Sequence, residues 1–153
     1  MNGLESLYQE LMLDHSKNPV GFGLPEGDPA AGEGQSHQLN PVCGDEITLR
    51  LGVTDGKIDG LHWEGHGCVV SQASASMLAD LVEEDAPSPD ELAELIAKFR
   101  EALRSRGAIP LDAEVFGDAA ALSGVSKFSA RVKCAMLGWV AAEDALRQAT
   151  QAE

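Results

Sequence analysis

The spacing of apolar residues predicts three amphipathic helices, one near each end of the chain and one between them. The middle helix has a clear start, because Ser88, Pro89 and Glu91 have the pattern of a capping box with proline at the first helical position. The apolar faces of the three helices are formed by Leu4, Leu7, Tyr8, Leu11 and Met12, by Leu92, Leu95, Ile96, Phe99 and Leu103, and by Val132, Met136, Trp139, Val140 and Leu146.

Between the first two helices the period changes to that of a β-strand. Apolar and polar residues alternate from Ile47 to Val53, as in a half-buried strand. The sequence Thr-Asp-Gly-Lys at 54–57 then predicts a tight hairpin turn. A return strand follows over 58–65, with Leu61 and Trp63 on one face. The pattern therefore predicts an α+β domain over residues 1–153, with a small, mainly antiparallel sheet of about three strands covered on one face by helices.

Three other segments have no strong period. Residues 18–41 contain many of the prolines and glycines and are predicted to form a long loop. Residues 71–76 are mostly small and lie in a predicted helix, where they would let another helix approach closely. Residues 107–127 are mixed in character, and one short helix is expected near 118–123.

Composition excludes several classes of function. A net charge of −14 argues against binding to nucleic acid, which needs a basic surface. No apolar run approaches the roughly 20 residues of a membrane span. The first residues lack the basic start and apolar block of a signal peptide, so we expect a cytoplasmic protein.

The three cysteines, Cys43, Cys68 and Cys134, are odd in number and far apart, which argues against a disulfide framework. Buried structural thiols, metal ligands and a reactive thiol all remain open. Cys43 stands two residues before Asp45 at the start of a strand, Cys68 begins a predicted helix, and Cys134 lies near the start of the last one. If the hairpin packs against the last helix, these four residues could form a Cys₃Asp set, which suits tetrahedral zinc.

Four blocks of sequence, in order, resemble the SufU family of zinc-dependent sulfur-transfer proteins, relatives of the IscU and NifU iron–sulfur cluster assembly proteins. The blocks are LYQELMLDHSKNPVGFG, NPVCGDEITL, GHGCVVSQASASM and LSGVSKFSARVKCAMLGW. The resemblance implies a SufE/NifU-like fold and a zinc ion bound by Cys43, Asp45, Cys68 and Cys134. It also implies that Cys43 accepts sulfur from a cysteine desulfurase that carries pyridoxal phosphate, after a histidine of the desulfurase replaces Cys43 on the metal. Sulfur would then pass to a downstream iron–sulfur scaffold.

Arg131 matches an arginine of this family three residues before the last cysteine, a helical spacing that would turn it toward Cys134. A solvated arginine on the helix surface is the alternative interpretation. Two features separate the chain from IscU-type scaffolds: Lys133 stands where scaffolds usually have histidine, and the interval from Cys68 to Cys134 is longer. We therefore expect sulfur transfer together with a desulfurase rather than independent catalysis. A scaffold on which a cluster is assembled, and a zinc-stabilised binding module without chemistry, both stay open.

Overall fold

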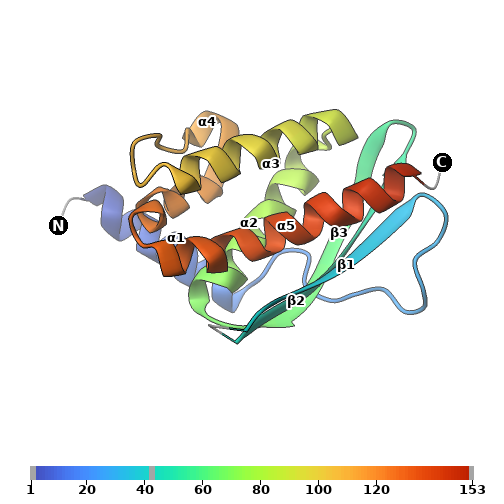
Figure 1. Ribbon diagram of the computed structural model, residues 1–153, viewed down its shortest axis with the longest axis horizontal. Helices are drawn as coiled ribbons and strands as arrows, with labels where there is room; N and C mark the ends of the chain where they lie inside the picture. The colour runs from blue at the N-terminus through green and yellow to red at the C-terminus, as the bar shows by residue number, and fades with distance from the viewer. Residues whose placement is uncertain (1–2, 42–43, 152–153) are drawn as a thin grey trace.

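The computed structural model describes residues 3–41 and 44–151. Five α-helices, one 3₁₀-helix and three strands are found in these residues (Figure 1). In chain order they are α1 (Gly3–Lys17), β1 (Glu33–Asn40), β2 (Asp45–Thr54), β3 (Lys57–His66), α2 (Val69–Asp85), α3 (Pro89–Arg104), α4 (Ala113–Phe116), the 3₁₀-helix η1 (Gly117–Lys127) and α5 (Ser129–Gln151). The α+β fold predicted from the sequence is confirmed.

The sheet is antiparallel throughout, with the strand order β1-β2-β3. The predicted hairpin joins β2 to β3, and its turn residues Asp55 and Gly56 have φ angles of 52° and 76°. Two positive φ angles in succession are typical of the two-residue turns that match the twist of a hairpin. Leu61 and Trp63 are both buried on one face, as the alternation predicts.

The first strand corrects the prediction that residues 18–41 are all loop. Residues 33–40 form β1, which pairs with β2 from Glu33 opposite Gly52 to Asn40 opposite Asp45. Its sequence, EGQSHQLN, has no β-branched residue and no run of alternating apolar residues, so it lacks the usual strand signal. The strand forms because β2 offers an unpaired edge and because α5 packs directly on it.

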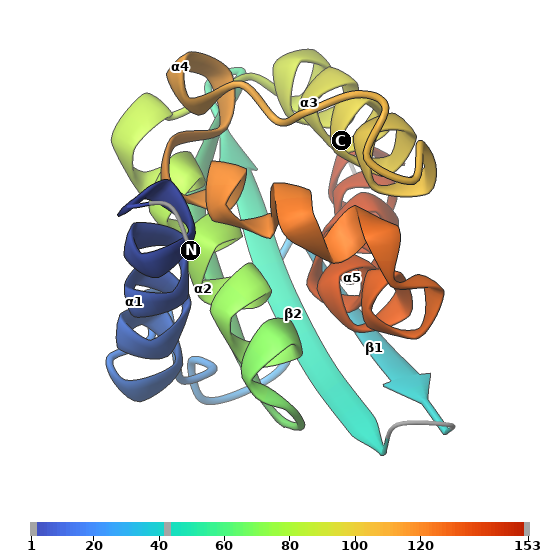
Figure 2. The same cartoon turned by 90° about the vertical axis from the view of Figure 1, so that its left-hand side faces the viewer.

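Helices α2 and α5 cover one face of the sheet, and α1 and α3 pack on the far side of α2 and α5 respectively (Figure 2). The helix α5 lies on β1 and β2, so closely that a Cβ added at Gly34 would lie 1.8 Å from the Ala145 carbonyl oxygen. The same helix also approaches α2 closely, because a Cβ at Gly138 would lie 3.2 Å from the Cβ of Ala75. The small residues of 71–76 therefore allow the close helix approach that was predicted.

A polar contact and an aromatic stack fix α5 at this crossing. The Ser74 hydroxyl donates to the Ala135 carbonyl over 2.6 Å and accepts the indole N–H of Trp139 over 2.9 Å. The buried Ser74 hydroxyl and the Trp139 indole N–H therefore both have hydrogen-bond partners, and a buried indole N–H usually needs one. The Trp139 ring also stacks on Phe99 of α3, with centroids 3.8 Å apart. The cysteine-bearing start of α5 is held in register with α2 and the sheet.

The capping box at the start of α3 is present, with Ser88 and Glu91 bonded reciprocally. In the mixed segment 107–127 the structure has α4 followed by η1, so the short helix expected near 118–123 is a longer stretch of 3₁₀ geometry. In the described part of the chain, no helix combines the length and apolar character needed to cross a membrane.

Candidate metal centre

Asp45 is the first residue of β2, and its side chain is fully buried on the helix side of the sheet. Its Oδ1 atom accepts the backbone N–H of Cys68 over 2.9 Å. This contact attaches the start of the strand to the start of α2, where exposed peptide N–H groups favour a negative charge. Asp45 therefore acts on α2 as a capping carboxylate that comes from a distant part of the chain.

Cys68 occupies the N-cap position of α2, and its side chain is half-buried. Its Sγ atom lies 4.0 Å from Asp45 Oδ2 and 3.9 Å from the Ser71 hydroxyl oxygen. The Ser71 hydroxyl in turn donates to the Cys68 carbonyl over 3.1 Å. The thiol is therefore held beside the carboxylate by the first turn of the helix.

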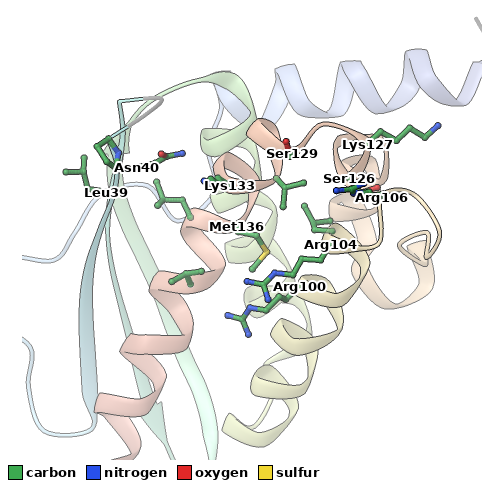
Figure 3. Close-up of a pocket in the computed structure, with 15 residues that line it drawn as sticks. Leu39, Asn40, Arg100, Arg104, Arg106, Ser126, Lys127, Ser129, Lys133 and Met136 are labelled. Atoms are coloured by element: carbon green, nitrogen blue, oxygen red, sulfur yellow. The ribbon is translucent and has the colours of Figure 1, made fainter.

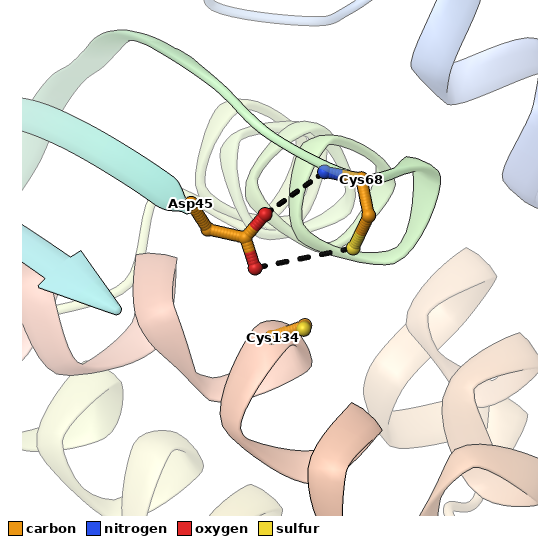
Figure 4. Close-up of side chains that lie close together, drawn as sticks. All are labelled: Asp45, Cys68 and Cys134. Carbon is orange, nitrogen blue, oxygen red and sulfur yellow. Dashed lines mark hydrogen bonds between the residues drawn. The ribbon is translucent and has the colours of Figure 1, made fainter. Parts of the chain in front are cut away.

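Cys134 lies in the second turn of α5, the third element that contributes to this group, and is 3% exposed. Its Sγ lies 3.6 Å from the Ala130 carbonyl oxygen of its own helix. A carboxylate oxygen of Asp45 and the sulfurs of Cys68 and Cys134 all lie within 4.8 Å of one another (Figure 4). The structure thus brings together three of the four ligands predicted from the sequence.

The chemistry of this group suits zinc. Two sulfurs bound to tetrahedral zinc at about 2.3 Å are roughly 3.8 Å apart, so a small closure of the observed spacing would complete the geometry. The buried Asp45 carboxylate also lacks a counter-charge: among the described residues, no lysine, arginine or histidine forms an ion pair with it. A buried carboxylate is costly unless it is paired or binds a cation, and a divalent metal would supply that charge.

Gly67 is part of this centre, although the sequence analysis did not single it out. A Cβ at this position would lie 2.2 Å from Asp45 Oδ1 and 2.7 Å from the Ser71 hydroxyl. Only a residue without a side chain lets the carboxylate reach the Cys68 N–H. The sequence could have indicated this role, because a glycine stands directly before Cys68 at the junction of a predicted strand and a predicted helix.

Two predicted site residues are not part of this group. Cys43 lies outside the described residues. Arg131 is exposed, and its side chain forms no hydrogen bond or ion pair with the described part of the chain. Its role beside Cys134 stays a prediction.

A second cluster combines His15, Asp80 and Asp118, whose candidate ligand atoms also lie within 4.8 Å of one another. Both ring nitrogens of His15 are already used, Nδ1 with the Ser76 hydroxyl at 2.7 Å and Nε2 with Asp118 at 2.9 Å. Burial raises the pKa of the neighbouring Asp80 above its usual value of 3.8. The hydrogen bonds tie α1 to α2 and η1, and this cluster is structural.

A search against protein families matches residues 7–148 to the family described as the NifU-like N-terminal domain. The chain belongs to this family. Among curated proteins, the NifU-like chain is 35% identical over 154 residues to an iron–sulfur cluster assembly scaffold protein IscU of Streptococcus pyogenes, covering 100% of this chain and 91% of the relative. It is 33% identical to the zinc-dependent sulfurtransferase SufU of Bacillus subtilis, covering 92% and 89% of the two chains.

Solved structures share this fold along nearly the whole chain. The N-terminal domain of a NifU-like protein from Brucella abortus has a TM-score of 0.80 over 96% of each chain, and at 24% identity it shows the fold alone. A candidate iron–sulfur cluster assembly scaffold of the SUF system from Fervidobacterium islandicum has a TM-score of 0.72 and 27% identity, covering 93% of this chain and 98% of its own. The NifU-like domain is therefore homologous both to proteins named as scaffolds and to one named as a sulfurtransferase.

Proposed function

We propose that this member of the iron–sulfur cluster assembly family is a zinc-dependent sulfur-transfer protein. It accepts persulfide sulfur from a cysteine desulfurase on Cys43 and passes it on to a downstream iron–sulfur scaffold. The observation that carries the proposal is the convergence of Asp45, Cys68 and Cys134 from three separate elements. That donor set matches the chemistry in the name of the B. subtilis relative, which is a zinc-dependent sulfurtransferase.

The zinc ligands in this proposal are Cys43, Asp45, Cys68 and Cys134. When bound, zinc would hold the cysteine sulfurs as thiolates near neutral pH. Asp45 and Cys68 are already linked, because Asp45 Oδ1 accepts the backbone N–H of Cys68 over 2.9 Å. Cys134 is buried against the same site.

The transfer step belongs to Cys43. Its thiolate attacks the terminal sulfur of the persulfide on the desulfurase cysteine, so that one S–S bond forms as another breaks. The desulfurase cysteine leaves as a thiolate, and Cys43 becomes the persulfide, with no net oxidation or reduction. The same exchange, run toward a thiol of the downstream scaffold, would discharge Cys43.

The remaining side chains have supporting roles. Cys68 is half-buried and Cys134 is buried, which limits the access of a partner's persulfide to their sulfurs. Asp45 keeps the start of α2 and the start of β2 at a fixed separation. Arg131 lies one turn before Cys134, and we propose that its positive charge stabilises the negatively charged ligand set.

A scaffold on which a cluster is assembled is the second candidate, and the IscU relative from S. pyogenes favours it. Two observations weigh toward sulfur transfer. No histidine belongs to the group formed by Asp45, Cys68 and Cys134 in the described residues. The residue before Cys134 is Lys133, which is a poor metal ligand when protonated.

The test is a single-turnover reaction of the zinc-loaded protein with a cysteine desulfurase and cysteine, followed by mass spectrometry of peptides containing each cysteine. The proposal expects one added sulfur atom on Cys43 and none after Cys43→Ser. A matched variant, Lys98→Ala, alters an exposed residue of α3 away from the centre and should react as the wild type does. Sulfur found on Cys68 or Cys134 at the wild-type rate in the Cys43→Ser protein would overturn the assignment.

The same samples also test for a scaffold and for a binding module. A coloured cluster in protein purified in air would favour the scaffold. A Cys43→Ser protein that still stimulates the desulfurase fully would favour a binding module without chemistry.

A further inference from the structure

A groove of about 700 Å³ lies between α3 and the first half of α5, closed at one end by the end of β1 (Figure 3). Its rim is basic on both sides. The basic residues that line it are Arg100 and Arg104 of α3, Arg106 in the following turn, Lys127 at the end of η1, and Lys133 of α5.

This concentration of positive charge is unexpected on so acidic a chain. The whole sequence has 11 lysines and arginines against 25 acidic residues, yet five of the 11 line this groove and none of the acidic residues that the structure describes does. Surface cations on a protein with an excess of carboxylates would ordinarily find acidic neighbours. The groove therefore departs from the charge of the surface around it.

The chain also leaves most of these charges unneutralised. Arg100 is paired with Glu143 through two hydrogen bonds of 3.0 and 2.7 Å. The other four basic residues are exposed, and none forms an ion pair within the described residues. An occupant with negative charge would thus gain contacts without first displacing an internal partner.

The floor of the groove is apolar. Met136 and Leu137 of α5 and Leu103 of α3 form its base, and Val132 lies beside them, half-buried. At the β1 end, Leu39 is 55% exposed, which is high for a leucine that lines a concavity. An apolar floor under a basic rim matches an occupant that carries both apolar side chains and carboxylates.

We propose that this groove is a docking site for an acidic segment of a partner protein, with apolar side chains between its carboxylates. The cations are spread over α3, the turn that follows it, η1 and α5, so they suit a chain of several separate charges better than one small anion. Nucleic acid is disfavoured because the net charge of −14 repels a long polyphosphate. A short acidic segment is affected mainly by the basic residues of the groove, because salt screens charges that lie more than a Debye length of about 8 Å away.

The groove adjoins the two chain segments that lead to proposed metal ligands. Pro41, two residues before Cys43 in the sequence, and Lys133, the neighbour of Cys134, both line it. A bound segment would therefore touch both chain segments that lead to proposed metal ligands. The docking site itself goes beyond the proposed function, and it stands whether or not sulfur is transferred.

Peptide binding to the full-length protein tests the proposal, with neither desulfurase nor persulfide present. The probe is a fluorescein-labelled peptide of glutamate and leucine with serine spacers, and the matched peptide has glutamine in place of each glutamate. Saturable binding of the glutamate peptide is expected, with weaker binding of the glutamine peptide. Binding should also fall as sodium chloride is raised. The double variant Arg104→Glu/Lys133→Glu should weaken binding by roughly tenfold or more.

The control is the double variant Lys98→Glu/Arg147→Glu, which reverses the same number of charges at exposed sites outside the groove. It should bind the glutamate peptide within about twofold of wild type, and circular dichroism should show that both double variants are folded. Absence of saturable binding, or equal losses in the two double variants, would overturn the proposal. So would complete displacement of the peptide by millimolar inorganic phosphate, which would identify a site for small anions instead.

Discussion

Replacing Gly67 by alanine should damage the metal centre without touching a ligand. The added Cβ would lie 2.2 Å from Asp45 Oδ1, 2.7 Å from the Ser71 hydroxyl and 2.9 Å from the Asp45 carboxyl carbon. The φ angle of 157° is also one that residues with side chains rarely adopt, at a cost of order 1–3 kcal/mol. Relief of the clash requires the carboxylate to turn away, which leaves the Cys68 N–H without its acceptor and costs about 1–3 kcal/mol more.

Because relaxation offsets part of each cost, we expect a net loss of about 2–4 kcal/mol in the free energy of unfolding, which for a domain of this size lowers Tm by roughly 5–15 °C. Thermal unfolding by circular dichroism, with and without added zinc, measures it. Zinc should also bind more weakly, since Asp45 is displaced. Gly124→Ala is the matched control, because a Cβ there meets nothing within 4 Å. A Gly67→Ala protein with the Tm and zinc affinity of wild type would refute the geometry described for this centre.

Three further predictions concern stability. Removing bound zinc with a chelator should lower Tm, because metal binding and folding are coupled in such sites, and an unchanged Tm would argue against a structural metal. His15→Ala should destabilise the protein by about 2–3 kcal/mol, because it removes a buried ring and the bond to Ser76, whereas His62→Ala on the exposed strand face should have little effect in the same urea titration. Hydrogen bonds from Arg100 hold the pKa of Glu143 below its usual 4.5, so this pair stabilises the fold above that pH and its contribution is lost on acidification through the lowered pKa. Glu143→Gln should therefore cost about 0.2–1 kcal/mol at pH 7, and the difference from wild type should shrink below pH 4.5; a difference independent of pH would contradict this.

The sequence predicted the elements whose signals are local. The β2–β3 hairpin follows from alternation and from Asp55-Gly56, which take the backbone angles that such a turn needs. The start of α3 follows from Ser88 and Glu91, which satisfy each other's backbone groups. In both cases, the interactions that fix the element lie within a few residues of one another, so a pattern in the sequence is sufficient.

The strand β1 could not be predicted in this way because its stability is tertiary. Its buried positions include Gly34, Ser36 and Asn40, which no hydrophobic pattern would select. Gly34 is required by the approach of α5 at Ala145, a contact between positions more than a hundred residues apart. Strand propensity carries little information where the neighbouring helix determines which residue fits.

Some features of the candidate site could likewise be predicted from the sequence, and others could not. Asp45, Cys68 and Cys134 were predicted as ligands because the resemblance to the SufU family implied them, whereas their positions in the sequence alone left buried thiols as an alternative. The structure brings these three residues together. The need for Gly67 depends on where the Asp45 carboxylate lies, which only the folded arrangement reveals. The basic groove was also beyond the sequence, since its charges come from three separate segments of an acidic chain.

Zinc K-edge X-ray absorption on protein purified in air is the decisive test of zinc binding at Asp45, Cys68 and Cys134, because it reports the metal and its ligands together. We expect one zinc per chain, bound mainly by sulfur at about 2.3 Å with one lighter ligand near 2.0–2.2 Å. In the Asp45→Ala protein the sulfur shell should remain, with weaker retention of the metal. A zinc shell without sulfur, or a protein that retains no zinc while its three cysteines are reduced, would rule out a cysteine-bound zinc centre.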